Sequence, residues 1–283
     1  MPGRRQSRQP AGCLFLRVAH LQERAESGNT IEHQQVGLRM RVVAAVAAAL
    51  VAACAAPPGP AELRAPPPLR ASGTPPAADC VPSWHARALP GKRLTRYAVS
   101  SDGREAAIEA QADASASMLR HALRREPEAL GMLRFSWRVP ALMEAADVRD
   151  RDREDAVVRV LLAFEGSEER LSPANRLLFD LAEGVTGERP PYATLIYVWD
   201  RHAPAESVVV NARTDRIRQI VVESGPAGLT SWRHYDRDIA ADFRRAFGEA
   251  PGPLVGVALM TDADNTGARA RALYGPVCLS PRS

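Results

Sequence analysis

The stretch "MLRFSWRVP", residues 132–140, decides the fold class of this chain. Apolar side chains stand at every second position from Leu133 to Val139, and polar side chains, Arg138 among them, stand between them. Successive side chains of a β-strand point to opposite faces, whereas a helix repeats its apolar side chains every three or four residues. The stretch therefore predicts a strand with one buried face and one solvated face.

The same alternation, or a short apolar run of strand length, recurs along the chain. Many strands without a regular alternation of strand and helix favour an all-β fold of two stacked sheets. We therefore predict a jelly-roll-like β-sandwich, with a mixed α+β fold as the alternative. The further predicted strands cover residues 96–100, 105–112, 116–124, 155–166, 193–200, 206–212, 216–224 and 254–262.

Two segments interrupt the strands with helical spacing. The first, residues 172–184, begins with Ser-Pro, the residue types favoured at the N-cap and the first helical position, and Gly184 is predicted to end it. The second, residues 236–248, spaces apolar side chains four apart and stops at Gly248. Both segments are short, so we predict helices inserted in connections between strands.

The segment "MRVVAAVAAALVAAC", residues 40–54, is typical of an export signal. A positive start precedes an apolar core that is too short to remain as a membrane-spanning helix. The last four residues, Val-Ala-Ala-Cys, resemble the bacterial lipobox, in which small residues precede a cysteine that is diacylated and becomes the new N-terminus. We predict a leader over residues 1–53, with the true start at Met40, and a lipid anchor on Cys54.

The predicted tether, residues 54–78, has eight prolines between positions 55 and 78. Such a segment is semi-extended, and at about 3.1 Å per residue it could hold a domain up to roughly 75 Å from a membrane. We expect an exported protein that is lipid-anchored in the bacterial envelope, in the outer membrane facing the periplasm. Its folded part is then one domain over residues 79–283.

The charge of the whole chain is misleading about its partners. The chain has 37 Lys and Arg against 33 Asp and Glu, with a pI near 9.1. Residues 1–53 hold seven Arg and three Glu, which leaves 30 basic and 30 acidic residues after them. The mature protein therefore has no net charge, and the composition gives no support for a nucleic-acid partner.

Cys80 and Cys278 stand at opposite ends of the predicted sandwich. In an exported protein, paired cysteines form disulfides. We predict a disulfide between Cys80 and Cys278 that closes a loop of about 200 residues and joins the first and last segments. Two separate buried thiols are the alternative.

The segment "VGVALMTDADNTG", residues 255–267, ends a strand in the oxygen-bearing side chains of Asp262, Asp264 and Thr266. This spacing resembles the first motif of haloacid-dehalogenase-type phosphatases, but only 17 residues follow it, too few for their α/β domain. The spacing also matches the start of a calcium loop, yet position 12 is Leu273 instead of glutamate. No cofactor is predicted, and calcium on this triplet is the weaker alternative to capping of the strand end or to ligand contact.

Asp155 and Arg159 lie four residues apart on a predicted strand and should share a face. A charge within an apolar run costs desolvation energy unless it is paired or lines a wet cleft, so this pair predicts either a structural ion pair or part of a site. Tyr197 and Trp199 also share a face. Two such aromatic side chains are either core residues or a platform on which sugar rings stack.

The segments "LRFSWRV", "REDAVVRVLLAF" and "VGVALMTDADNTGARARALYG" resemble the bacterial domain-of-unknown-function family three-zero-four-seven. The resemblance covers nearly all of residues 79–283 and is most specific at the Asp155–Arg159 spacing and at "TDADNT". It implies a periplasmic or envelope-anchored β-sandwich without an established activity, so it assigns no catalytic role. Where the family commonly has two Asp residues, this chain has Glu154 and Asp155.

Three hypotheses about function follow. The first is a non-catalytic module that binds an envelope glycan or a related polar ligand. The second is a hydrolase or lyase of envelope polysaccharide, with Asp155 and either Asp262 or Asp264 as the acid/base pair. The third is a structural lipoprotein whose charged pairs brace the sandwich. We predict the first, with a cleft lined by Arg138, Asp155, Arg159, Tyr197, Trp199, Asp262 and Asp264.

Overall fold

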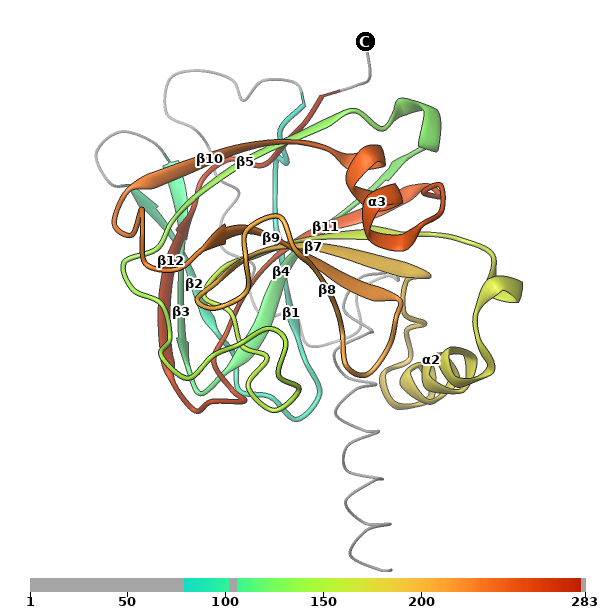
Figure 1. Cartoon of the computed structure of the whole chain (residues 1–283), viewed down its shortest axis with the longest axis horizontal. Helices are drawn as coiled ribbons and strands as arrows, with labels where there is room; N and C mark the ends of the chain where they lie inside the picture. The colour runs from blue at the N-terminus through green and yellow to red at the C-terminus, as the bar shows by residue number, and fades with distance from the viewer. Residues whose placement is uncertain (1–78, 102–105, 281–283) are drawn as a thin grey trace, which may run out of the picture. The chain divides into compact units, whose positions relative to one another are not determined.

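The computed structural model describes residues 79–101 and 106–280 and shows two β-sheets stacked as a sandwich (Figure 1). The predicted β-sandwich is therefore confirmed. Within these residues, α-helix is confined to α2 (Pro173–Thr186) and α3 (Ile239–Phe247), both in connections. None of the described helices is long and apolar enough to cross a membrane. The predicted leader, Cys54 and the tether lie outside the described residues.

One sheet has seven strands. All neighbours in it pair antiparallel except β7 and β9, which are parallel. Every residue of β6 and β7 is buried, which explains why these strands are apolar runs instead of alternating patterns. The order across the sheet is β1 (His85–Ala88), β4 (Ala116–Arg125), β11 (Leu254–Asp262), β6 (Arg159–Phe164), β7 (Ala193–Asp200), β9 (Ile217–Ser224) and β8 (Val208–Val210).

The other sheet has six strands and is antiparallel throughout. The apolar side chains of β5, from Leu133 to Trp137, are buried, as their alternation predicts. Phe135 stacks on Tyr197 of β7 with ring centroids 5.5 Å apart, so these two faces form the core between the sheets. The order is β10 (Trp232–Asp238), β5 (Met132–Arg138), β12 (Arg269–Tyr274), β3 (Ala106–Asp113) and β2 (Arg96–Ser101), with β13 (Cys278–Leu279) paired to β5.

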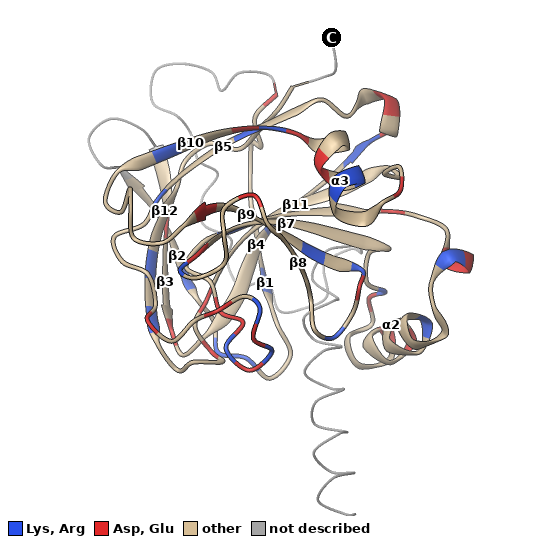
Figure 2. Ribbon diagram, viewed as in Figure 1, with Lys and Arg blue, Asp and Glu red and all other residues tan. Residues whose placement is uncertain are grey.

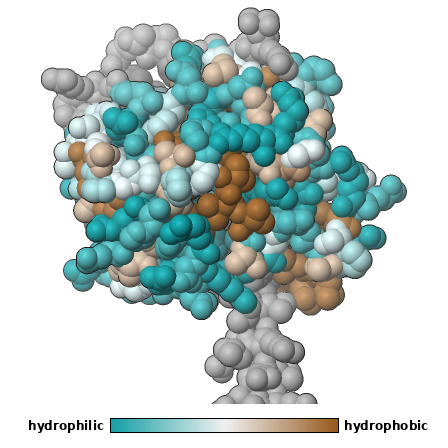
Figure 3. All heavy atoms as spheres, viewed as in Figure 1, coloured by the Kyte–Doolittle hydropathy of each residue, from teal (hydrophilic) through white to brown (hydrophobic). Residues whose placement is uncertain are grey.

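Helix α2 begins as predicted, because the Ser172 side chain accepts a hydrogen bond from the backbone of Asn175. It continues past Gly184, however, and ends at Gly187, whose φ of 73° places it in the left-handed region that favours glycine. The predicted end at Gly184 is therefore wrong. Hydrophobic residues gather over α2 on the face seen in Figure 3. They form a stripe spaced four apart, Leu177, Leu181 and Val185, which points away from the sandwich.

Helix α3 confirms its prediction, with Asp238 as the N-cap and Gly248 as the C-cap. The strand prediction was wrong in five places. The predicted strand from residue 155 begins only at Arg159, because residues 155–158 form the approach to β6. Strands β1, β10, β12 and β13 were not predicted. β10 is polar at the edge of its sheet, where its exposed side chains hide the alternation.

The predicted disulfide between Cys80 and Cys278 is present and spans 198 residues of sequence. The two cysteines also form an antiparallel β-bridge, and Leu279 donates a backbone hydrogen bond to Asp79. The first and last described segments therefore lie side by side, as expected from the sandwich prediction.

Candidate functional site

A pocket of about 110 Å³ opens on the outer face of the seven-stranded sheet. Because Tyr197 packs inward against the other sheet, its strand neighbour Ile196 points outward into this pocket. The apolar floor comprises Leu89, Ala116, Met118, Leu161, Ile196, Ile217 and Met260. The polar end comprises Lys92, Glu154, Arg159, Asn211, Arg213, Asp262, Asp264 and Asn265. Thr194 also lines the pocket but lies opposite Ala163, four positions along β6 from Arg159. None of these lining residues is aromatic.

Arg159 is the central cation of the polar end, because β6 begins there beside the end of β11. Its side chain is only 6% exposed and forms an ion pair with Asp262. Its Nη2 donates to the carbonyl of Glu154 at 2.7 Å. Among the described residues its Nε finds no acceptor. A buried, charged donor without a partner is costly, so Arg159, which lines the pocket, retains an unused hydrogen-bond donor.

Burial raises the pKa of Asp262 to about 7, and the neighbouring carboxylates of Asp155 and Asp264 add to this rise. The guanidinium of Arg159 opposes the effect of burial in part. Burial likewise raises the pKa of Glu154. The polar end of the pocket therefore contains carboxyl groups that change charge closer to neutral pH than exposed ones do.

Asp155 has a different position from the one predicted. It accepts hydrogen bonds from the backbone of Asn265 at 3.2 Å and from the backbone and hydroxyl of Thr266 at 2.7 and 2.6 Å. It thereby fixes the tight turn between β11 and β12, in which Gly267 has a φ of 65°. Because residues 155–158 are not in the sheet, Asp155 does not pair with Arg159, whose partner is Asp262. The predicted Asp155–Arg159 ion pair is therefore wrong.

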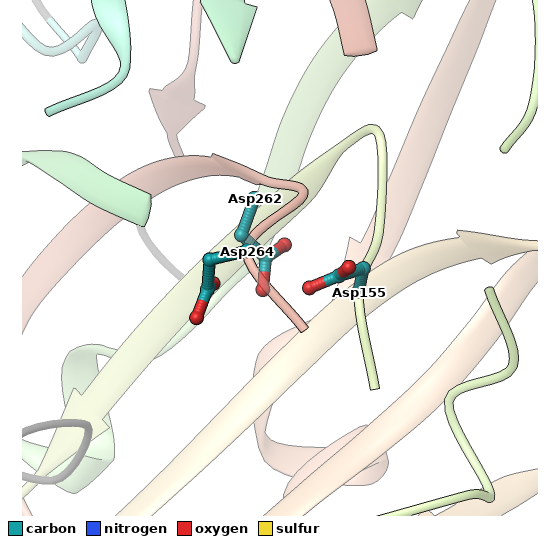
Figure 4. Close-up of side chains that lie close together, drawn as sticks. All are labelled: Asp155, Asp262 and Asp264. Atoms are coloured by element: carbon teal, nitrogen blue, oxygen red, sulfur yellow. The ribbon is translucent and has the colours of Figure 1, made fainter. Parts of the chain in front are cut away.

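The acidic residues of this region do converge. One carboxylate oxygen from each of Asp155, Asp262 and Asp264 lies within 4.8 Å of the others (Figure 4). The donor set nevertheless fits a calcium ion poorly. Asp262 binds Arg159, Asp264 binds Lys92, and Asp155 accepts three N–H or O–H groups, so positive charge and donors already meet these oxygens. Thr266 is the third residue of the weaker calcium alternative. Its hydroxyl group donates a hydrogen bond to Asp155.

The remaining predicted ligand contacts lie elsewhere. Tyr197 and Trp199 are 0% and 1% exposed, on the inner face of β7, where their polar atoms bind Asp242 and the Gly225 carbonyl. The prediction of a sugar-stacking platform is therefore wrong. Side chains alternate between the two faces of a strand, and both rings lie on the face of β7 that packs into the core. Arg138 lies on the other sheet, over the ring of Trp232, and does not line the pocket.

Several pocket residues were not predicted. Lys92 is the only lysine of the chain, which was a usable signal, and it reaches Asp264 from the segment before β2. Glu154 and Arg213 pair at 3.1 Å at the pocket edge. Asn211 donates to Glu154 at 2.7 Å, from a loop about 57 positions away in sequence. Only folding brings these residues together, so no local pattern marks them.

These observations define a class of protein: a disulfide-closed β-sandwich with a small, charged pocket on the outer face of one sheet. The sequence matches the family described as "Protein of unknown function (DUF3047)" over residues 82–278, and the chain belongs to that family. This agrees with the resemblance found in the sequence. No curated protein sequence matches the chain.

Among solved structures, the chain is similar to the Family 11 Carbohydrate-Binding Module of cellulosomal cellulase Lic26A-Cel5E of Clostridium thermocellum. The two share 10% identity over 70% of this chain and 88% of that chain, with a TM-score of 0.35. A likeness at this level carries no argument about function.

Proposed function

We propose that the protein is an envelope lipoprotein whose pocket binds an N-acylated sugar without chemical conversion. The observation that supports it is the unused Nε donor of Arg159, a residue that lines a pocket with both charged and apolar side chains. An acetamido group matches these surroundings. Its carbonyl oxygen would accept from Arg159, its N–H would donate to a carboxylate of the polar end, and its methyl group would contact the apolar floor.

This mode differs from ring stacking, because no aromatic residue lines the pocket. The cavity of about 110 Å³ suits one small substituent instead of a whole sugar ring, which would lie across the opening. Envelope glycans rich in N-acetylated sugars are then the ligand class. Recognition rests on one donor, one acceptor and an apolar contact.

The enzyme alternative has less support. It required Asp155 to act as an acid or base with Asp262 or Asp264. Asp155 is buried, does not line the main pocket, and uses both of its oxygens to hold Asn265 and Thr266. These contacts instead give Asp155 the bracing role of the structural hypothesis.

Ligand binding is tested with N-acetylglucosamine and glucose, titrated calorimetrically into the purified full chain. We expect N-acetylglucosamine to bind at least about 10-fold more tightly, since glucose lacks the acetamido group that the pocket would hold. Ala116→Leu, which places a larger side chain on the pocket floor, should abolish this preference. Ala258→Leu is the matched control, because Ala258 lies on the same face of β11 outside the pocket. Equal binding of both sugars, or equal loss in both variants, would refute the proposal.

Both alanines are buried, so either change can strain the fold. The thermal midpoint of each variant is therefore measured first. A variant that remains folded and loses only the preference for the acetamido group supports the assignment, whereas a preference that survives in folded Ala116→Leu contradicts it.

Lipid anchoring is the second part of the proposal and is tested at Cys54. Cys54→Ala should move the protein from the membrane fraction to the soluble fraction of a bacterial host and abolish labelling by radioactive palmitate, because the acylated thiol is gone. Ser72→Ala, in the predicted tether, is the matched control and should change neither result. Labelling that persists in Cys54→Ala would disprove the anchor.

A further inference from the structure

A second hollow lies on the outer face of the six-stranded sheet and shares no lining residue with the pocket. It is an open groove of about 770 Å³ between strands β2, β3 and β12 and the segment around Leu142. Its lining includes Arg93, Arg96, Arg269 and Arg271, which we call the arginine groove. Among the described lining residues, Asp113 is the only carboxylate. The lining therefore has an excess of positive charge.

The register of the strands places these arginines in an ordered array. Arg96 of β2 is opposite Gln111 of β3, and Gln111 is opposite Arg271 of β12. Register partners in a sheet point to the same face, and neighbouring strands lie about 4.8 Å apart, so the two guanidinium groups start about 10 Å apart. Arg269 follows on the same face, two residues from Arg271. Buried Ala270 and Ala272 alternate with these arginines and point inward.

The positive charge of the groove is only partly balanced. Arg271 binds Glu109 at 2.6 Å, and Arg269 approaches Asp113 at 3.4 Å. Both arginine side chains remain more than half exposed in these pairs, so an anion from solution can compete for them. Within the described residues, neither Arg93 nor Arg96 forms a close ion pair, although the positive charge of Arg96 helps to lower the pKa of Glu109. Figure 2 shows where Lys and Arg lie on the ribbon.

This concentration of charge contrasts with the composition after residue 53, in which basic and acidic residues are equal in number. Elsewhere the arginines are interleaved with carboxylates. In the loop at residues 147–153, for example, Arg149 binds Asp147 and Arg153 binds Asp150. A groove with four arginines and one carboxylate is therefore a local departure from the rest of the surface.

We infer that the arginine groove docks a linear acidic polysaccharide. Guanidinium groups bind carboxylates through two parallel hydrogen bonds, and an array of exposed arginines gains affinity by binding several carboxylates of one chain. An extended polymer can lie along a groove, whereas a planar bilayer would meet only its rims. This inference does not depend on the pocket or on the N-acylated sugar.

The test uses polygalacturonate, which carries a carboxylate on each sugar, with neutral dextran as the matched polymer, against the purified full chain. We expect binding of polygalacturonate alone, and a loss of at least about 10-fold on raising NaCl from 0.05 to 0.5 M, because exposed charges are screened. Arg93→Gln with Arg96→Gln should weaken binding by a similar factor. Both arginines are exposed and neither forms a close ion pair among the described residues, so their replacement should leave the fold intact.

The matched control is Arg149→Gln with Arg153→Gln, which removes the same charge from the loop at residues 147–153. Polygalacturonate binding should remain within about twofold of the unchanged chain in this control. Equal loss in both double variants, equal binding of dextran, or no binding of polygalacturonate would overturn the inference. Binding of phosphatidylglycerol vesicles that is as tight, and is lost in the groove variant, would also overturn it and assign the groove to a membrane surface. Binding of N-acetylglucosamine should be unchanged in the groove variant.

Discussion

Arg159→Met is expected to lower the free energy of unfolding by about 3–5 kcal/mol at pH 8. The substitution keeps most of the side-chain volume but removes the cation that faces Asp262. Both side chains are 6% exposed, so water cannot replace the lost partner. The remaining carboxylate would be a buried, unpaired charge, which is far costlier than a missing surface ion pair. Urea unfolding followed by tryptophan fluorescence measures the difference.

The loss should depend on pH in a defined direction. Burial already raises the pKa of Asp262 from 3.8 to about 7 with Arg159 present, and removal of the guanidinium raises it further. A carboxyl group with a raised pKa in the folded state contributes stability below its unfolded pKa. That contribution is lost as the pH rises through the folded value. The deficit of Arg159→Met should therefore be smaller at pH 5.5 than at pH 8.

Arg153→Met is the matched control, because Arg153 pairs with Asp150 on the surface with side chains 53% and 37% exposed. It should cost less than about 1 kcal/mol. Adding Asp262→Asn to Arg159→Met should recover part of the stability by removing the unpaired charge. A deficit that is equal in the two arginine variants, or unaffected by pH, would contradict the buried ion pair.

The second large effect is expected at the disulfide. Replacing both Cys80 and Cys278 by alanine should lower the free energy of unfolding by about 2–5 kcal/mol. The bond joins two cysteines that are 198 positions apart in sequence. Its loss therefore increases the conformational entropy of the unfolded chain. It also leaves only backbone hydrogen bonds between the first described segment and the segment of β13, which has two residues in the sheet.

Chemical reduction gives an independent check of the same effect. Dithiothreitol should shift the urea midpoint of the unchanged protein to that of the double alanine variant and leave the variant itself unaffected. A midpoint of the unchanged protein that does not respond to the reductant would show that the bond does not stabilise the fold.

The fold was predictable where a local rule acts along one strand or helix. The alternation in residues 132–140 identified β5 and its buried face, and the apolar spacing with Gly248 identified α3. Prediction failed where the surroundings of a segment, and not its local sequence pattern, determine its structure. β10 has a polar sequence because it lies at the edge of its sheet. Helix α2 continues past Gly184 and ends at Gly187, which adopts the left-handed conformation of the C-cap.

The candidate site was predictable only in part, for a related reason. Arg159, Asp262 and Asp264 were found because charges in or beside an apolar strand are unusual, and all three line the pocket. Both faces of β7 are buried. The sequence pattern therefore does not show whether the face with Tyr197 and Trp199 packs between the sheets or on the outer side. It also could not pair Arg159 with the right carboxylate, because Asp155 and Asp262 are equally plausible until the strand boundary is known.

The sequence by itself determined the sandwich class, the family and the partners of the disulfide, because alternation, motif and cysteine number are properties of the chain in one dimension. Only the tertiary structure decided which side chains share a pocket and which arginines share a groove. Lys92, Arg159 and Asp264 come from separate segments, and Arg96 and Arg271 from separate strands. Their proximity results from strand order and register, which depend on packing across the whole sandwich and leave no local trace in the sequence.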